Sequence, residues 1–415
     1  MTGDTGAEVR RLADWDSERL AELAAKYGTP VYVIDLVRVR ENAARITDAF
    51  DEAILYYAAK ANTSRSVLRT VAAAGFGIEC ASAGEVQRAL DAGVGPDRIL
   101  YTAVNPPGGE LDYACAVADQ HPAVTVTAGA ADTIDRLVDR EYAGRLWLRI
   151  HPGVGAGHSA AVSTGADAKF GVDPDEALTI GRRATDAGLE ITGLHAHLGS
   201  GITDDDLHRH RELVANLVSV ADVFPTPISV IDIGGGFGVP YRPDESPIDL
   251  DAIAASVRST VGERSVDVAI EPGRYLVADA GVLLCEATTV KTIEDGRIVG
   301  VDAGMTDLLR PALYDAYHEI QPVSSTSAPV VPTTITGPVC ESTDVFCTDR
   351  PVPTIDRGDL VAIGNAGAYG FEMANNYNTR PRPATVVIDG NRDALDRRRE
   401  TVADIVALEQ EVEWV

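Results

Sequence analysis

The sequence predicts an α/β chain: a (β/α)8 barrel of the TIM type followed by a C-terminal β-domain. Two observations predict the barrel. Eight short apolar runs alternate with roughly ten to twenty helix-compatible residues, and chemistry-bearing residues follow several of these runs. A third observation predicts the β-domain, because from about residue 280 the sequence becomes rich in Val, Thr and Pro with turn signals. A doubly wound open sheet is the alternative, but it rarely needs so regular an eightfold repeat.

The N-terminal part predicts a helix and then a strand. Residues 8–27 carry apolar residues at helical spacing, and Gly28-Thr29-Pro30 stops that helix. Residues 31–34 form a short apolar strand.

The barrel strands are expected at eight apolar runs. They cover residues 54–59, 77–81, 99–104, 124–128, 146–150, 193–198, 230–233 and 268–271. Beyond them, residues 322–332 are expected to be a loop or edge, and residues 403–412 are compatible with a helix. Because active sites of such barrels lie at the carboxyl ends of the strands, the residues that follow these runs are the first candidates for chemistry.

The charge balance is strongly acidic, at −27 with only four lysines in 415 residues. A surface crowded with Asp and Glu stays hydrated at high salt, so we interpret it as adaptation to a salty cytoplasm. An enzyme that is merely acidic is the close alternative. The charge argues against nucleic acid as a partner.

The cysteines and the N-terminus indicate a cytoplasmic protein. The five cysteines show neither C-x-x-C spacing nor a Cys/His cluster, which predicts reduced thiols and no metal site. The N-terminus is acidic and polar, unlike a signal peptide, and no apolar run approaches 18 residues.

Lys60 is the leading catalytic candidate, because it follows a buried run at a predicted strand end. Desolvation lowers the pKa of a lysine, and the neutral amine attacks carbonyl groups. A lysine whose head reaches solvent is the alternative. Lys169 lies in a loop of small residues, and Lys26 and Lys291 lie outside the barrel, which makes all three poorer candidates.

A glycine-rich turn, Gly234 to Gly238, follows the seventh run, where barrels commonly bind phosphate. A lysine and a phosphate loop in one barrel suggest pyridoxal phosphate. Glu271, the last residue of the eighth run, could keep the pyridine nitrogen protonated. His197 could stack on the ring, although a core histidine bonded to backbone is an equal alternative.

The remaining candidates concern the substrate. Arg274 and Arg310 suit bidentate carboxylate binding, and Tyr314 shares a face with Arg310 if that segment is helical. Cys340, beside Glu341, could donate a proton, although a small buried hydrophobe is the commoner role of cysteine. Tyr369 could bind a phosphate or simply cap a turn.

The order of these motifs resembles the diaminopimelate decarboxylase family, fold-type III pyridoxal-phosphate enzymes with a barrel of the alanine-racemase type. The matching motifs, running over residues 31–383, are Ala59-Lys60-Ala61-Asn62, His197-Leu198-Gly199-Ser200, Gly234–Gly238, Glu271-Pro272-Gly273-Arg274, Cys340-Glu341-Ser342 and Gly367-Ala368-Tyr369-Gly370.

The resemblance implies a set of site residues. The cofactor would be bound by Lys60, His197, Ser200, Gly234, Gly235, Gly236, Glu271, Gly273, Arg274 and Tyr369. The substrate would be bound by Arg274, Arg310, Tyr314, Glu341 and Tyr369, and Cys340 would donate the proton.

The resemblance also implies an assembly and a domain division. In the family the segment with the cysteine reaches the lysine of the other subunit, so the active unit would be a homodimer with shared sites. Residues 36–279 would form the barrel, and residues 1–35 and 280–415 the β-domain. The implied reaction is decarboxylation of meso-2,6-diaminopimelate to L-lysine and CO2.

Several alternatives remain within the fold. Racemases with this barrel usually place arginine at the pyridine nitrogen, and Glu271 speaks against them. Diamine decarboxylases of the ornithine type lack the arginines that correspond to Arg274 and Arg310. Carboxynorspermidine decarboxylase is the nearest enzymatic alternative. A non-catalytic homologue would be expected to have lost Lys60 or Cys340, and both are present. Tyr275 and the pair Phe371-Glu372 depart from the family pattern.

Overall fold

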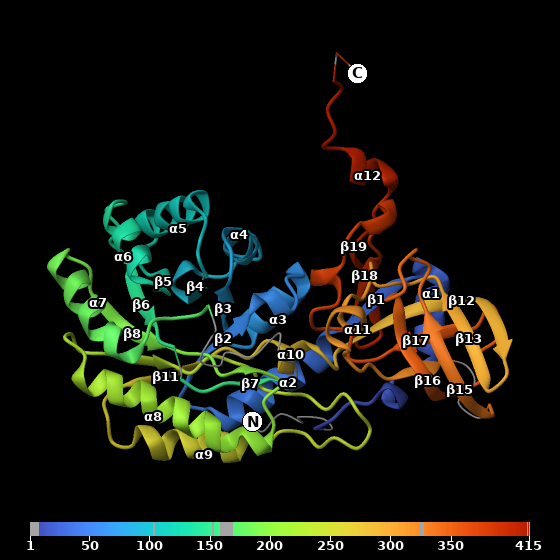
Figure 1. Cartoon of the computed structure of the whole chain (residues 1–415), viewed down its shortest axis with the longest axis horizontal. Coiled ribbons are helices and arrows are strands. Elements are labelled where there is room, and N and C mark those ends of the chain that lie inside the picture. The colour runs from blue at the N-terminus through green and yellow to red at the C-terminus, as the bar shows by residue number, and fades with distance from the viewer. Residues whose placement is uncertain are drawn as a thin grey trace. The chain divides into compact units, whose positions relative to one another are not determined.

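The computed structural model describes residues 8–102, 104–151, 153–157, 169–323, 328–412 and 414. Within this description the chain divides into two compact units (Figure 1). The first unit contains Val39–Val239 and Ser246–Leu276. The second contains residues 8–38, the segment Pro240–Glu245 and the described residues from Val277 onward. The units therefore differ from the expected domain limits chiefly at Pro240–Glu245, a short segment whose contacts are with the second unit.

The first unit is a closed barrel of eight parallel strands, as the sequence predicted. Its strands are β2 (Ile54–Ala58), β3 (Gly77–Cys80), β4 (Ile99–Thr102), β5 (Thr125–Ala128), β6 (Arg145–Arg149), β8 (Ile191–His195), β10 (Val230–Asp232) and β11 (Asp267–Ile270).

Helices alternate with these strands, as parallel strands require crossover connections. They are α2 (Leu36–Ala49), α3 (Arg65–Ala73), α4 (Ala83–Asp91), α5 (Gly108–Gln120), α6 (Ala131–Val138), α7 (Pro174–Asp186), α8 (Leu207–Val223), α9 (Leu250–Val261) and the short α10 (Arg274–Val277). Side-chain caps define where several of them begin. Ser64 accepts from the amide of Val67, and Ser82 accepts from that of Glu85. Short 3-10 turns η2 (Ala59–Ala61), η3 (Pro96–Arg98) and η5 (Asp204–Asp206), and the strand pair β7 (Ala156–Gly157) and β9 (Gly199–Ser200), complete the unit.

The barrel interior is filled by large aromatic side chains that face glycines. The rings of Tyr56 and Trp147 meet edge to face, with centroids 6.2 Å apart. A Cβ on Gly193 would lie 2.4 Å from the Trp147 ring, and one on Gly77 would lie 2.7 Å from the Tyr56 ring. The two aromatic residues occupy this volume only because the facing positions carry no side chain, so the interior is a packed core.

The second unit is a nine-stranded mixed sheet. Its strands are β1 (Val31–Asp35), β12 (Gly281–Ile293), β13 (Gly296–Val301), β14 (Ile320–Pro322), β15 (Val330–Thr336), β16 (Val345–Pro353), β17 (Leu360–Ile363), β18 (Ala384–Asp389) and β19 (Arg392–Arg397). Its helical elements are η1 (Leu12–Asp14), α1 (Ser17–Tyr27), α11 (Arg310–Tyr314), η6 (Phe371–Met373), η7 (Tyr377–Thr379) and α12 (Val402–Val406).

Strand β1 lies in the interior of this sheet, between β12 and β18. Its side chains alternate between two hydrophobic clusters, with Tyr32 in one and Val31 and Val33 in the other. Leu20 and Leu23 of α1 pack in the cluster that contains Val31. The N-terminal segment is therefore an integral part of the β-domain.

Two expected helices are shorter than the sequence pattern suggested. The first begins at Ser17 because Asp16 caps it, accepting from the amides of Glu18 and Arg19. The C-terminal helix covers only Val402–Val406. Of the expected loop or edge at 322–332, residues 324–327 lie outside the described residues, and residues 330–332 begin an interior strand of the sheet, Val330–Thr336. The small-residue loop before Lys169 also lies largely outside them.

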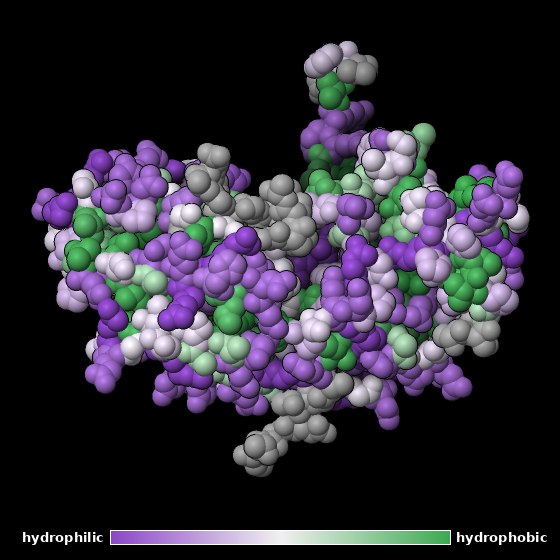
Figure 2. Space-filling model, turned by 60° about the horizontal axis from the view of Figure 1, so that its bottom comes forward, coloured by the Kyte–Doolittle hydropathy of each residue, from purple (hydrophilic) through white to green (hydrophobic). Residues whose placement is uncertain are grey.

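Figure 2 shows one face on which polar residues predominate and apolar residues are scattered in small groups. No described helix is both long enough and apolar enough to cross a membrane.

Candidate active site

Lys60 lies in the 3-10 turn that directly follows β2, and it meets a carboxylate that the sequence reasoning missed. Its Nζ lies 3.3 Å from Oε2 of Glu79 on the neighbouring strand β3. The Lys60 side chain is 42% exposed, whereas that of Glu79 is 1% exposed. Burial raises the pKa of Glu79 to about 8, against the opposing pull of the Lys60 charge. A glutamate inside the apolar run 77–81 was the signal that could have revealed it.

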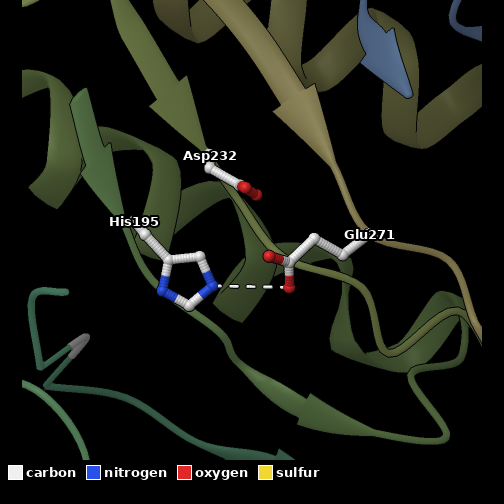
Figure 3. A group of neighbouring side chains, drawn as sticks. All are labelled: His195, Asp232 and Glu271. Carbon is white, nitrogen blue, oxygen red and sulfur yellow. Dashed lines mark hydrogen bonds and ion pairs between the residues drawn. The ribbon is translucent and has the colours of Figure 1, made fainter. Parts of the chain in front are cut away.

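A second buried group forms at the ends of β8, β10 and β11, where His195, Asp232 and Glu271 converge (Figure 3). Nε2 of His195 lies 3.4 Å from Oε2 of Glu271. Glu271 was predicted from the sequence, but His195 and Asp232 were not. Both follow apolar residues within their strands, so the sequence pattern indicates structural residues of a strand and gives no sign of a catalytic or binding role.

His197 lies two residues beyond β8 and is half-buried. Its Nδ1 accepts the amide of Gly235 at 3.3 Å. Burial, with the nearby charges of Lys60 and Arg149, lowers the pKa of His197 to about 3. The ring is therefore neutral at physiological pH, as suits a group that stacks on a heteroaromatic ring.

The glycine loop after β10 is shaped by close backbone contacts. Gly234 and Gly236 have φ of 68° and 98°, in the left-handed region that favours glycine. A Cβ on Gly235 would lie 2.0 Å from the carbonyl oxygen of Glu271. The amide of Gly234 donates to Asp232 Oδ1 at 2.8 Å, so the first two amides of the loop have acceptors within the protein. These positions therefore require glycine for backbone conformation and close packing, whether or not the loop binds a phosphate.

Two further barrel candidates lie together. Nη2 of Arg274, at the start of α10, donates to Oγ of Ser200 at 3.0 Å, and Arg274 is buried. A Cβ on Gly273 would lie 3.0 Å from the Ala58 Cβ, which indicates a close approach to the end of β2. The neighbouring Tyr275 is buried.

The second unit holds the remaining substrate candidates. Arg310 and Tyr314 are the first and last residues of α11, and Arg310 is 2% exposed. Nη1 of Arg310 donates to Oη of Tyr241 at 2.8 Å, and its Cζ lies 5.1 Å from the centre of the Tyr241 ring. Tyr241 belongs to the segment Pro240–Glu245, and the sequence reasoning missed it because it follows the barrel's glycine loop.

Cys340 and Glu341 lie in the loop between β15 and β16, and both are exposed in the single chain. Asp344 organises this loop by accepting from the amides of Met305 at 2.5 Å and Val339 at 2.7 Å. The other four cysteines are free and buried, in the role of small hydrophobes, so Cys340 alone among the five is exposed.

Tyr369 has φ of 56°, a left-handed conformation that is uncommon for a non-glycine residue and is frequent at functional sites. The unusual pair that follows has structural partners. Phe371 packs beneath the guanidinium of Arg397, whose Cζ lies 4.2 Å from the ring centre, and Glu372 lies 3.2 Å from the same arginine.

The barrel residues suit a pyridoxal-type cofactor. Oε1 of Glu271 is buried and has no hydrogen-bond partner among the described residues, so the carboxylate retains an acceptor for a ring N–H. The Lys60 side chain is partly exposed, so its amine is accessible to a cofactor, and His197 provides a neutral ring. Electron withdrawal by a protonated ring is the chemistry such a carboxylate supports.

Comparison with known proteins agrees with this assignment. Residues 36–278 match the family described as "Pyridoxal-dependent decarboxylase, pyridoxal binding domain". A diaminopimelate decarboxylase of Methanothermobacter thermautotrophicus is 40% identical over 93% of this chain and 92% of its own. One from Zymomonas mobilis is 37% identical over 95% and 96%, respectively. The crystal structure of the Helicobacter pylori diaminopimelate decarboxylase complexed with L-lysine matches with a TM-score of 0.88 and 31% identity, covering 94% of this chain and 98% of that one.

The fold and the barrel site thus define a pyridoxal-dependent decarboxylase with an alanine-racemase-type barrel. Within that class, the similarity over almost the whole chain is to one group of enzymes. The chain belongs to the diaminopimelate decarboxylase family.

Proposed function

We propose that this chain is a carboxy-lyase that uses pyridoxal 5′-phosphate to convert meso-2,6-diaminopimelate into L-lysine and CO2, the last step of lysine biosynthesis. The observation that carries the reaction type is the buried carboxylate of Glu271 at the end of β11, with an acceptor oxygen still available. When bound, the cofactor supplies a ring that withdraws the electron pair left behind as CO2 departs.

The roles of the barrel residues follow from their chemistry. Lys60 holds the cofactor through its amine, and Glu271 accepts the pyridine N–H and favours its protonated form. His197 covers one face of the ring. Ser200, Gly234, Gly235, Gly236, Gly273 and Arg274, with Tyr369 of the second unit, surround the phosphate. Gly236 is the member of the loop best suited to donate its amide, because the two before it already donate within the protein.

The roles at the far end of the substrate depend on charge. That end carries both an ammonium and a carboxylate group. Arg310 and Tyr314, with Arg274, bind the carboxylate, and Glu341 pairs with the ammonium group. The thiol of Cys340 donates a proton to the carbon that has lost CO2. This arrangement distinguishes the substrate from ornithine and lysine, which lack the far carboxylate.

The proposed active form is a homodimer with shared sites. Cys340 and Glu341 are exposed in the single chain, which suits residues that complete a site in another subunit. The domain limits proposed for each subunit are 36–279 and 1–35 with 280–415. The protein would work in a salty cytoplasm, given its net charge of −27.

Product analysis tests the function directly. Purified protein is incubated separately with meso-diaminopimelate, ornithine, lysine and carboxynorspermidine, and the products are identified. We expect rapid release of CO2 and L-lysine from the first compound only. Borohydride treatment should fix the cofactor on the peptide that contains Lys60. Label on Lys169 would contradict the site, and equal rates with ornithine or lysine would contradict the substrate.

A further inference from the structure

Asp232 is a buried carboxyl group for which the reaction above has no use. It ends β10, and its side chain is 0% exposed. Figure 3 shows it directed toward the same region as Glu271 and His195. One ligand atom from each of these three side chains lies within 4.8 Å of the others. Such a close pair of buried carboxyl groups needs a physical explanation.

Two carboxylate oxygens in this group, one on Asp232 and one on Glu271, receive no hydrogen bond from the described residues. Oδ1 of Asp232 accepts the Gly234 amide at 2.8 Å, and Oε2 of Glu271 faces Nε2 of His195 at 3.4 Å. Oδ2 of Asp232 and Oε1 of Glu271 have no partner among the described residues. Two ionised carboxylates would repel in this low-dielectric interior, whereas one proton on Oδ2 of Asp232 removes the repulsion. It uses one of the two lone pairs of Glu271 Oε1 and leaves the other for the pyridine N–H.

The titratable groups around Asp232 are five acids or bases and three neutral rings. The acids are Asp232 itself, Glu271 and Glu79, and the bases are Lys60 and Arg149. Tyr56 and the two histidines, His195 and His197, are neutral in this interior, because burial raises the pKa of the phenol and lowers those of the imidazoles. Burial also raises the pKa of Glu79 to about 8, so Glu79 is protonated near neutral pH, and Asp232 and Glu271 are the two acids whose protonation remains to be assigned.

Contacts indicate which acid keeps the proton. Glu271 has a hydrogen-bond partner in His195, with 3.4 Å between Oε2 and Nε2. Asp232 is less exposed than Glu271, and the hydrogen bond that it accepts comes from the neutral amide of Gly234. Burial and the Glu271 charge raise the pKa of Asp232 well above its ordinary value. For Glu271, burial alone would raise the pKa, but the hydrogen bond with the His195 ring and the charge of Lys60 oppose it, and the pKa is lowered.

We propose that Asp232 is a positioning residue that stays protonated, donates a hydrogen bond from its O–H to Glu271 and accepts the Gly234 amide with its other oxygen. Asp232 thereby links Glu271, which we assign to the pyridine nitrogen, to the glycine loop, which we assign to the phosphate. This inference rests on the proposed function for the identity of the cofactor. Its consequence is that Glu271 presents one negative charge, held in place by donors on two sides.

The test is a pair of substitutions with opposite expectations. In Asp232→Asn the amide retains a carbonyl oxygen for Gly234 and an N–H donor for Glu271, which reproduces the protonated acid. Asp232→Leu has similar size and makes neither bond. We expect Asp232→Asn to bind pyridoxal phosphate with nearly wild-type affinity. Asp232→Leu should bind it at least about tenfold more weakly, a change of about 1.4 kcal/mol.

A spectroscopic measurement does not depend on turnover. The infrared difference spectrum at neutral pH between the wild-type holoenzyme and Asp232→Asn should contain the carbonyl stretch of a buried protonated carboxyl group, because the band of protonated Glu79 is common to both proteins and cancels. It decides the question even if Asp232→Leu fails to fold. The proposal is overturned if the difference spectrum lacks the band. It is equally overturned if Asp232→Asn loses cofactor as Asp232→Leu does, or if the purified protein holds a stoichiometric divalent ion at this group.

The inference and the proposed function fail in different ways. If the wild type binds pyridoxal phosphate and shows the band but does not decarboxylate meso-diaminopimelate, the substrate assignment is wrong and the role of Asp232 stands. If it decarboxylates meso-diaminopimelate without the band, the function stands and the role of Asp232 is wrong.

Discussion

Arg310 and Tyr241 are joined by a hydrogen bond and a ring contact at once, with 2.8 Å between Nη1 and Oη and 5.1 Å between Cζ and the ring centre. The Tyr241 ring in turn meets His318 edge to face, at 5.4 Å between centroids. Arg11 anchors the same segment by donating to the carbonyl oxygens of Arg242 and Glu245. A segment inserted in the barrel sequence therefore orients the arginine that we assign to the far carboxylate.

Tyr241→Phe removes the hydrogen bond but keeps the ring. Hydrogen bonds to charged groups contribute about 1.5–3 kcal/mol. We therefore expect kcat/KM for meso-diaminopimelate to fall by about 10- to 100-fold, mainly through a higher KM. Tyr317→Phe is the matched control, because Tyr317 contacts Arg242 and Arg350 and should leave KM unchanged. A loss confined to kcat would contradict the positioning role.

Arg310→Ala removes the carboxylate partner itself. Truncating one member of a buried charge pair costs about 2–5 kcal/mol, so kcat/KM should fall at least about 30-fold. Attachment of the cofactor at Lys60, followed by its absorbance, should be preserved. Steady-state kinetics with lysine provide the control, because lysine lacks the far carboxylate and its poor turnover should change little. An equal loss with both compounds would show that Arg310 does not recognise that carboxylate.

Glu79→Gln should alter how stability depends on pH. The folded-state pKa of Glu79 is raised to about 8, above an unfolded value of about 4.3. Its contribution to stability is thus fully present below the unfolded pKa and is lost as pH rises through about 8. Melting temperatures of the cofactor-free protein between pH 5 and 9 should fall less steeply in the variant. Glu22→Gln, at an exposed position, should retain the wild-type slope.

Mixing inactive variants tests the shared site. Lys60→Ala and Cys340→Ala chains should each be inactive, and exchange of subunits should restore up to about a quarter of wild-type activity through hybrid dimers. Mixing Lys60→Ala with itself provides the baseline. Demonstrated exchange without any recovery would mean that each subunit supplies its own acid.

Salt should stabilise the protein far beyond simple screening. At about 1 M salt the Debye length is already near 3 Å, so ordinary charge repulsion is screened by then. With a net charge of −27 and four lysines, we expect the melting temperature to continue rising above that concentration of KCl. A melting temperature that is unchanged between low and molar salt would refute the adaptation.

The barrel could be predicted because each of its strands is a short apolar run, and backbone geometry then brings the strand ends together. Lys60 and Glu271 follow such runs and were found. Glu79 and Asp232 were missed because they occupy strand positions that otherwise carry apolar residues. Their chemistry arises from neighbours on adjacent strands, which are far apart in sequence.

Tyr241 was missed for a different reason. It is flanked by barrel residues in the sequence, yet its contacts lie in the other unit, and no local pattern reports such a long-range contact. The partners of the Gly234 and Gly235 amides were equally hidden, since a glycine-rich loop predicts available donors and cannot indicate which are already engaged.

The place of β1 in its sheet constrains the order in which the chain can mature on the ribosome. Val31 pairs with Leu284 on one side and with Ala384 on the other. The strand therefore emerges early and must wait while the whole barrel sequence is translated before either neighbour exists. The barrel strands can close in the meantime, since all of them lie between these partners. Nascent chains that stall before β18 would then carry a finished barrel and an unpaired strand edge, the kind of surface that chaperones recognise.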